Sequence, residues 1–486
     1  MRKRQGWLSW AVLTLALAIS AISAQAQTNY MIVHSFLDPT AEGSEPSGQP
    51  EVIGPSIYGM TMLGGGFDNG AIFQVSTNGS GFHLLYSFEQ GGTNGANPCG
   101  SLVFSSSDSS FYGMTFFGGT NGGGVIFQLA EDGSTYQVLH DFAGGPDDGR
   151  FPNGTPLVSG FNIYGMTGAG GTNGLGVVFT VDITGSGFQV VHSFSGAPND
   201  GDFPNEGLVI DSSFILYGTT FYGGTNDMGT AFSINTDGSG FTILHGFGQD
   251  TNDAVNPVGA LALDGSTLFG VSAYGGASDM GAIFSVNTDG SGYTLIHQFA
   301  GGTNDGAFPQ YGSLVVVNHS FLYGATLFGG TDDVGVVFRM NLDGSEYTNI
   351  HDFVDNGIDG IGPFYGPMVT PSGLYGMTIN GGTTNAGIIY TYPFPAESND
   401  VTDARITDIS IVNTNDVRIT WTVTATLPHT DAVQFTHGDA QGGYTNNFLT
   451  RSPDFFEPAG VITDSWSDVG AATNGPSRYY RVIITP

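Results

Sequence analysis

The sequence has little positive charge. It contains 10 lysines and arginines against 43 aspartates and glutamates, which gives a formal net charge of -33. Lys3 is the only lysine, and between residues 27 and 396 only Arg150 and Arg339 oppose 32 acidic residues. Such a surface repels phosphate backbones and anionic membranes, so nucleic acid is excluded as a partner. The acidity is typical of a soluble exported protein, and a cation-binding role is the alternative reading.

Cysteine and long apolar runs are also scarce. Cys99 is the only cysteine, so disulfides within the chain cannot hold the fold, which must bury enough apolar surface instead. A lone cysteine beside a strand is more often a packing residue than a nucleophile. Beyond the N-terminus no segment has about 20 consecutive apolar residues. We therefore expect no integral membrane segment after signal removal.

The N-terminus has the three parts of an export signal. Residues 1–4 are basic, residues 7–22 are apolar, and Ala24-Gln25-Ala26 forms a small-residue cleavage site. We expect residues 1–26 to be a signal peptide. The mature protein is then expected to be secreted, periplasmic or held at the cell surface.

A pair formed by an aromatic residue and glycine recurs seven times along the chain. The spacings between successive pairs are 54, 52, 53, 52, 54 and 52 residues. Repeats of about 40 to 50 residues indicate propeller blades or a solenoid. The pairs are Tyr58-Gly59, Tyr112-Gly113, Tyr164-Gly165, Tyr217-Gly218, Phe269-Gly270, Tyr323-Gly324 and Tyr375-Gly376.

Each repeat contains four short β-type runs separated by Gly, Asn, Asp and Pro, without helical periodicity. We term these runs a, b, c and d. In one unit they are Ser313–Val317, Phe321–Thr326, Gly335–Met340 and Tyr347–Phe353. The Asp343-Gly344 pair joins c and d as a tight hairpin. Each unit therefore predicts a four-stranded antiparallel meander.

The two ends of the array distinguish a closed ring from an open solenoid. Residues 31–36 form a d strand with no a, b or c before it. Residues 367–370, 374–378 and 387–392 form a, b and c with no d after them. A ring removes its exposed edges when the first strand completes the last blade. Residues 27–395 therefore predict an all-β, seven-bladed β-propeller of four-stranded blades, closed by its N-terminal strand.

Phrases such as "LYGTTFYGGTNDMGTAF" carry a family resemblance. From about Met31 to Pro393 the chain resembles the GloVer-type tandem-repeat exported bacterial proteins. The resemblance implies propeller-like repeats and a secreted or cell-surface location. It supplies no catalytic residue.

Beyond Pro395 the composition changes and arginine returns. Val417, Ile419, Trp421 and Val423 alternate with polar residues at period two, which is typical of a half-buried strand. Residues 396–486 therefore predict a small β-sandwich, and they resemble a fibronectin type III or immunoglobulin-like module. The resemblance implies a spacer or adhesive unit. The arginines are Arg405, Arg418, Arg451, Arg478 and Arg481.

The loops predict one acidic face on the propeller. Because neighbouring strands alternate in direction, the b-to-c and d-to-a loops emerge on the same side of the ring, where binding residues usually lie. Asp, Asn and Gly are the residues of tight turns, which is the favoured interpretation; carboxylates also suit Ca²⁺, and binding of a divalent cation is the alternative. The candidate binding residues are Asp68, Asp147, Asp148, Asp200, Asp227, Asp253, Asp305, Asp332 and Asp333.

Histidines and aromatic residues recur beside these loops. The histidines share one position of strand d, roughly 20 Å from the axis, so they cannot converge on one zinc, and a repeated structural hydrogen bond is the favoured interpretation. The aromatic residues precede or enter the b-to-c loops; packing between blades is favoured and sugar stacking is the alternative. The histidines are His34, His140, His192, His245, His297 and His351, with Tyr86 in the remaining unit. The aromatic residues are Phe67, Phe116, Phe117, Phe221, Tyr222, Tyr274 and Phe328.

The sequence holds no nucleophile elbow, no His-Glu-x-x-His motif, no Walker motif and no cysteine-histidine pairing. The leading hypothesis is an exported, non-enzymatic binding or scaffold protein. Its loop-rich face would engage a glycan, a protein or a divalent cation. The alternatives are a hydrolase or lyase acting on polysaccharide and a purely architectural protein of the cell surface.

Overall fold

A computed structural model describes residues 30–89, 92–310 and 312–394, together with the backbone of seven strands between residues 401 and 485. The chain divides into two compact units, Met1–Pro393 and Phe394–Pro486. The expected signal peptide, residues 1–26, lies outside the described residues. Within the described part of the chain, no helix has the length and apolar character needed to cross a membrane.

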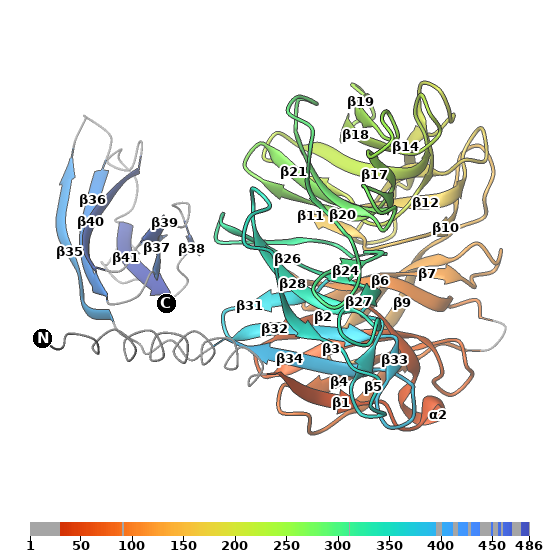
Figure 1. Cartoon of the computed structure of the whole chain (residues 1–486), viewed down its shortest axis with the longest axis horizontal. Coiled ribbons are helices and arrows are strands. Elements are labelled where there is room, and N and C mark those ends of the chain that lie inside the picture. The colour runs from red at the N-terminus through yellow and green to blue at the C-terminus, as the bar shows by residue number, and fades with distance from the viewer. Residues whose placement is uncertain are drawn as a thin grey trace, which may run out of the picture. The chain divides into compact units, whose positions relative to one another are not determined.

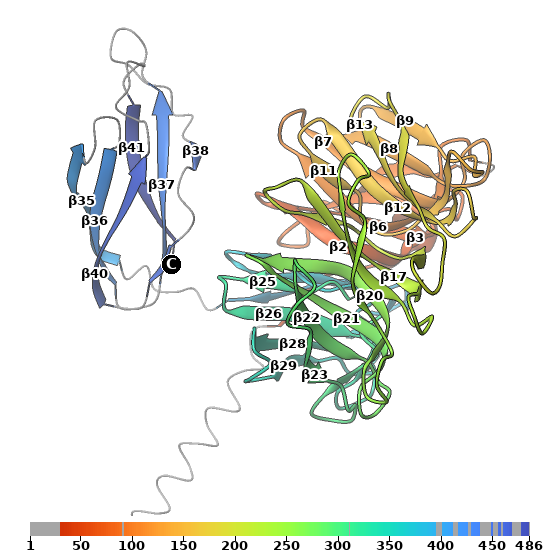
Figure 2. The same ribbon diagram turned by 90° about the horizontal axis from the view of Figure 1, so that it is seen from above.

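The first unit is a ring of seven antiparallel blades, which confirms the predicted propeller. The chain passes around the ring in sequence order, so that the last strands (blue) lie beside the first ones (red) (Figure 1). Strand a of each blade is innermost, and β2, β6 and β20 lie towards the middle of the unit in Figures 1 and 2. A short helix, α2 (Pro39–Glu42), precedes blade 1.

The first five blades have the following strands. Blade 1 contains β2 (Ser44–Ile53), β3 (Ser56–Leu63), β4 (Ala71–Ser76) and β5 (His83–Ser87). Blade 2 contains β6 (Ala96–Ser105), β7 (Ser110–Phe117), β8 (Val125–Ala130) and β9 (Tyr136–Asp141). Blade 3 contains β10 (Gly149–Pro152), β11 (Leu157–Ser159), β12 (Asn162–Gly170), β13 (Val177–Asp182) and β14 (Gln189–Ser193). Blade 4 contains β15 (Gly201–Pro204), β16 (Val209–Ile210), β17 (Ile215–Gly223), β18 (Thr230–Asn235) and β19 (Thr242–Gly246). Blade 5 contains β20 (Ala254–Asp264), β21 (Thr267–Gly275), β22 (Ala282–Asn287) and β23 (Thr294–Gln298).

The last two blades complete the ring. Blade 6 contains β24 (Gly306–Ala307), β25 (Val315–Val317), β26 (Phe321–Thr326), β27 (Phe328–Gly329), β28 (Val336–Asn341) and β29 (Thr348–Asp352). Blade 7 contains β30 (Gly360–Ile361), β31 (Met368–Thr370), β32 (Gly373–Thr378), β33 (Asn380–Gly381), β34 (Ile388–Pro393) and β1 (Met31–Ser35). In register, Met31 lies opposite Thr391 and Ser35 opposite Ile388. The N-terminal strand therefore completes the last blade, as predicted.

The glycine of each repeated aromatic-glycine pair leaves space for an aromatic ring of strand c in the same blade. In blade 5, a Cβ atom added to Gly270 would lie 2.4 Å from Cζ of Phe284. The same close approach occurs in every blade, with Tyr390 in place of phenylalanine in blade 7. The aromatic ring of strand c thus fills the space beside strand b and packs into the core between blades.

Strand a begins earlier than the sequence prediction placed it. In blade 6 the prediction started at Ser313, whereas β24 already pairs with β27 at residues 306 and 307. Equivalent pairs are β10 with β12, β15 with β17, and β30 with β33. The prediction was wrong here because glycine and proline around these positions read as loop residues.

A contact around proline joins each blade to the one before it. The residue before the proline has a φ between 50° and 70° and donates its N–H to a carbonyl in the preceding b-to-c loop, at 2.7 to 3.2 Å. The proline ring then packs on the last glycine of that loop. We call this the proline contact. Its donors and acceptors are Glu45 and Ala386, Asn97 and Asn69, Phe151 and Gly123, Phe203 and Leu175, Asn256 and Met228, Phe308 and Met280, and Gly362 and Val334.

Aromatic stacking joins the blades a second time, at strand d. The ring at the histidine position of one blade stacks on an aromatic ring that begins strand d of the next blade, with centroids 3.5 to 4.4 Å apart. Tyr30, just before β1, closes this series by stacking on His351. Its hydroxyl also donates to Asp359 at 2.5 Å. The N-terminal end of the described propeller chain is therefore fixed at the closure.

The described part of the second unit consists of β-strands. One sheet contains β35 (Val401–Ile411), β36 (Val417–Ala425) and β40 (Gly460–Asp468). The other contains β37 (His429–His437), β38 (Leu449–Thr450), β39 (Phe455–Glu457) and β41 (Arg478–Thr485). The side chains of this unit lie outside the described part, so the sandwich of fibronectin type III or immunoglobulin type stays a prediction.

The proline contact yields a stability prediction with a matched control. Gly335 has a φ of 108°, and an added Cβ would lie 2.5 Å from Cδ of Pro363. Gly174 has a φ of 77° but no atom within 4 Å of an added Cβ. Gly174→Ala should lower the free energy of unfolding by about 1–2 kcal/mol through backbone strain alone. Gly335→Ala should cost roughly 1–3 kcal/mol more through overlap. Urea unfolding measures both, and equal losses would contradict the proposed contact.

Candidate functional site

The d-to-a and b-to-c loops lie on one face of the propeller, as predicted. In every blade the second glycine of the b-to-c loop donates its N–H to a carbonyl of the d-to-a loop. These bonds hold the two sets of loops together, and we call this side the loop-rich face. The donors and acceptors are Gly65 and Pro39, Gly119 and Gly92, Gly171 and Gly145, Gly224 and Asp200, Gly276 and Asp253, Gly330 and Gly302, and Gly382 and Asp359.

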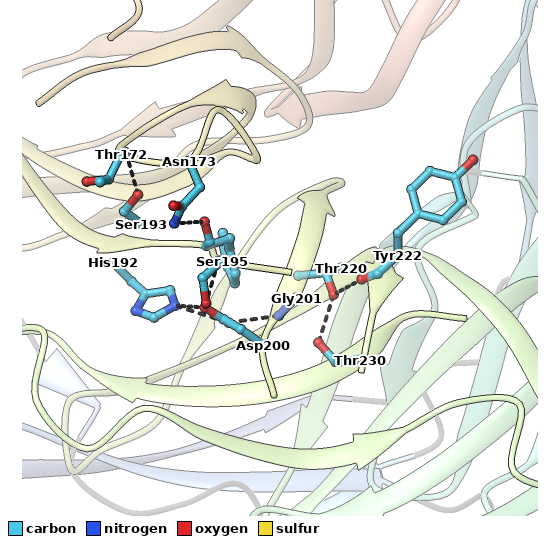
Figure 3. Close-up of polar contacts among 11 residues, drawn as sticks. Thr172, Asn173, His192, Ser193, Ser195, Asp200, Gly201, Thr220, Tyr222 and Thr230 are labelled. Carbon is cyan, nitrogen blue, oxygen red and sulfur yellow. Dashed lines mark hydrogen bonds and ion pairs between the residues drawn. The ribbon is translucent and has the colours of Figure 1, made fainter. Parts of the chain in front are cut away.

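Four of the predicted acids hold the d-to-a loops in place. Asp200 lies 3.1 Å from Nε2 of His192 and accepts N–H bonds from Ser195 and Gly201 (Figure 3). Burial alone would raise the pKa of Asp200, but the hydrogen bonds from His192 and Gly201 outweigh it and hold that pKa below its ordinary value. Asp148 and Asp305 make the same bonds, and Asp253 caps its loop in the same way.

The repeated histidine therefore has a structural partner eight residues along the chain. His140, His192, His297 and His351 each form a hydrogen bond with that aspartate. This confirms the predicted structural hydrogen bond at these four positions.

Three more of the predicted acids hold the b-to-c loops. Asp68, Asp227 and Asp333 have left-handed φ angles of 60°, 57° and 58°. Each accepts the N–H of the glycine four residues earlier, at 2.8 to 3.0 Å. These carboxylates perform turn chemistry, which was the favoured interpretation of the acidic loops.

The remaining two acids, Asp147 and Asp332, are exposed. Asp332 accepts an N–H bond from Asp355, in the neighbouring loop. Among the described residues, no three histidine, cysteine or acidic side chains are grouped so that they could hold a metal ion. Calcium binding by the nine acids stays a prediction.

The aromatic residues of this face are more exposed than we expected. Phe67, Phe117, Tyr222, Tyr274 and Phe328 have exposed fractions of 50%, 46%, 45%, 39% and 42%. The prediction that these five rings are buried in the core between blades was therefore wrong, although Phe117 and Tyr274 each contact a phenylalanine of the next blade at their edges. Phe116 and Phe221, by contrast, are half-buried.

Four of these rings occupy the same repeat position, two residues after a buried hydroxyl residue of strand b. In blade 4 the hydroxyl of Thr220 donates to the carbonyl of Tyr222 at 2.8 Å. Equivalent bonds of 2.8 Å fix the carbonyls of Phe117, Tyr274 and Phe328. The bond fixes the backbone while the ring projects outward; in Figure 3 the ring of Tyr222 points away from the polar network.

Tyr222, Tyr274 and Phe328 belong to the consecutive blades 4, 5 and 6, and we call them the aromatic arc. The half-buried Phe308 contacts both Tyr274 and Phe328 edge-on, with centroids 6.0 Å apart in each case. Phe221 contacts Tyr222 at 4.8 Å. Each ring of the arc is therefore supported by a second aromatic ring, and Tyr274 and Phe328 share one. Rings held in this way lose little conformational entropy when a partner binds.

Sequence reasoning missed one unusual residue near the propeller axis, Glu206. It follows Pro204 by two positions, where blades 1, 2, 3 and 5 have glycine with positive φ. Glu206 has a φ of 86°, is only 2% exposed, and its Oε1 atom has no hydrogen-bond partner. Burial raises the pKa of this carboxyl to about 8. The loss of glycine from a repeated Pro-x-Gly sequence was the available signal.

The comparison with known families agrees with the repeat. Residues 21–215 and 162–390 match the Gloeobacter/Verrucomicrobia repeat. The chain belongs to this repeat family. No curated relative matches this Gloeobacter/Verrucomicrobia repeat protein.

Solved propellers share the fold of this repeat protein at low sequence identity. An oligogalacturonate lyase in complex with manganese is 12% identical with a TM-score of 0.51, over 76% of this chain and 93% of that one. The oligogalacturonate lyase of Vibrio parahaemolyticus is 13% identical, also with a TM-score of 0.51, over 76% and 94%. Similarity at this identity shows the fold alone.

A comparison of two aspartates tests whether buried acids hold the loops in place. Asp200→Ala removes a buried cap and leaves several N–H groups unpaired, so it should lower the free energy of unfolding by about 2–3 kcal/mol. Asp147→Ala removes an exposed carboxylate and should change it by less than about 0.5 kcal/mol. Thermal and urea unfolding measure both. Equal effects would mean that Asp200 does not hold its loop.

Glu206 yields a prediction about pH. Its pKa is higher in the folded state than in the unfolded chain, so the folded state binds the extra proton and loses stability as pH rises from about 4.5 towards 8. Relative to the wild type, Glu206→Gln should therefore gain about 1.4 kcal/mol of stability per pH unit between about pH 5 and 7.5.

The variant Glu206→Gly separates strain from ionisation. It removes the carboxyl and also suits the φ of 86°, so it should be more stable than Glu206→Gln at every pH. Urea unfolding across the pH range measures both variants. A pH-independent difference between wild type and Glu206→Gln would show that the carboxyl titrates normally.

Proposed function

We propose that this protein is an exported, non-enzymatic propeller that binds neutral polysaccharide at the aromatic arc. The observation that carries the proposal is the set of three exposed rings at one repeat position in three consecutive blades. Exposed aromatic rings stack on the apolar faces of sugars, and several large exposed rings at equivalent positions are a feature of interaction sites. The basic, apolar and Ala-x-Ala segments at the N-terminus support export.

The charge of the chain supports a neutral glycan over an anionic one. Between residues 27 and 396 there are two arginines and 32 acids. The guanidinium group of Arg150 lies 4.5 Å from the ring centre of Phe151, and that of Arg339 lies 4.5 Å from the ring centre of Phe321. Both arginines therefore already contact an aromatic ring of the protein. A polyanion such as the oligogalacturonate of the similar lyases would be repelled from this surface. For the same reason the alternative of a lyase acting on acidic polysaccharide is not favoured.

The second unit fits this proposal as a spacer. Its two sheets are consistent with a fibronectin type III or immunoglobulin-like module that separates the propeller from the cell surface. Binding by the aromatic arc requires no contribution from it. A truncated chain ending at residue 394 should therefore keep the full affinity for glycan if it folds.

The arc can be tested by substitution. Tyr222→Ala, Tyr274→Ala and Phe328→Ala should each weaken binding to neutral oligosaccharides about 10-fold, because each ring contributes roughly 1–2 kcal/mol of stacking and burial. Isothermal titration with cello-, xylo-, laminari- and chito-oligosaccharides measures the affinities. Retention on insoluble glucan or chitin is an independent readout.

The chain also offers a matched control for these variants. Phe161 and Phe214 are 78% and 64% exposed but lie in a-to-b turns, on the face opposite the arc. Phe161→Ala and Phe214→Ala should leave the affinity unchanged. The proposal fails if these control variants weaken binding as much, or if no neutral glycan binds. Release of new reducing ends from a glycan would instead establish an enzyme.

A further inference from the structure

The propeller axis contains a cavity of about 370 Å³. Strand a of every blade contributes to its wall, from Gln49 in blade 1 to Met368 in blade 7. Phe104 and Val158, which lie near the a-to-b turns, are part of the lining. The axial cavity is therefore displaced from the aromatic arc, towards the opposite face of the ring.

One residue of this wall breaks the sevenfold pattern. Glu51 pairs with Tyr58 of strand b. In each of the other six blades, the residue that pairs with the corresponding aromatic residue is apolar. Glu51 is therefore the one exception at this repeat position. The six apolar residues are Val103, Leu157, Val209, Ala262, Val315 and Met368.

Glu51 has no partner of opposite charge. It is the only charged residue that lines the axial cavity, and among the described residues its carboxyl has neither a hydrogen bond nor an ion pair. Burial raises its pKa to about 7. An ammonium group in the cavity would compensate the carboxylate and remove this destabilisation.

The remainder of the wall suits an amphipathic ligand. Leu102, Leu261 and Leu314 are at most 5% exposed and supply an apolar lining. Ser101 and Thr155 already accept N–H bonds from the neighbouring strands at 2.8 and 3.0 Å, which leaves each hydroxyl proton free to donate. The volume is near the lower end of the roughly 300–1,000 Å³ that is common for ligand pockets.

We propose that the axial cavity is a second binding site, for a small organic cation whose ammonium group sits on an apolar or ring-shaped body and pairs with Glu51. The site is independent of the glycan proposal. It uses other residues and lies towards the other face.

The probe for this site is cyclohexylammonium, with cyclohexanol as its neutral isostere. Isothermal titration and ligand-observed NMR on the full mature chain at pH 8 should show cyclohexylammonium binding at least 10-fold more tightly than cyclohexanol. Cyclohexylammonium should also raise the melting temperature, because it binds only the folded state. Glu51→Gln should lose the preference for the cation.

Two further variants keep the test decisive. Asp147→Asn removes one negative charge from an exposed position on the loop-rich face and should keep the preference for the cation over cyclohexanol. This variant distinguishes direct pairing with Glu51 from attraction by the overall negative charge of the protein. Glu51→Val introduces the kind of residue found in other blades, so it should fold and also lose the preference. Equal binding of the two probes to wild type, unchanged binding to Glu51→Gln, or no binding at millimolar probe would each overturn the proposal.

Discussion

The whole propeller depends on the proline contact between successive blades. A residue with left-handed φ donates its N–H to the preceding b-to-c loop, and the following proline packs on that loop's last glycine. The contact occurs seven times, and once it joins the two ends of the ring, from Glu45 to Ala386. Because Cys99 is the only cysteine, no disulfide within the chain can replace it. The pairing of β1 with β34 and the stacking of Tyr30 on His351 reinforce this closure.

Repetition separates structural residues from candidate functional ones. A side chain that recurs in blade after blade, such as the Asp200 type of loop cap, meets a need that every blade shares. Glu51 and Glu206 depart from the repeat, and exposed rings occupy the repeat position of the aromatic arc in some blades only; each of these features carries a cost that the fold does not require. Exposed rings favour association, Glu206 is a carboxyl buried without a partner for its Oε1 atom, and Glu51 is a half-buried carboxyl beside an apolar wall. A binding function would explain why the chain has residues that carry such costs.

The sequence predicted the ring well because strand spacing and the unpaired d strand at residues 31–36 are properties of the chain itself. The acidic site was harder to predict, since aspartate serves both turns and ligands, and only the N–H bond from Gly223 shows which role Asp227 has. The hydroxyl bond from Thr220 fixes the backbone at Tyr222, but the sequence does not show that the ring of Tyr222 projects outward and not into the core. Glu51 lies at the position of Val315 and Met368, which the sequence analysis placed in strand a, but only the three-dimensional structure shows that this position borders a cavity at the propeller axis.

Hydrogen exchange at the ring closure tests the central claim most directly. The amide of Glu45 donates across the closure, whereas the amides of Asn97 and Asn256 make the same bond inside the array. A closed ring predicts that all three exchange with similar protection and that residues 31–35 are as protected as the d strands of other blades. Rapid exchange confined to Glu45 and residues 31–35, with Asn97 and Asn256 still protected, would contradict the closed ring and the shared loop-rich face that rests on it.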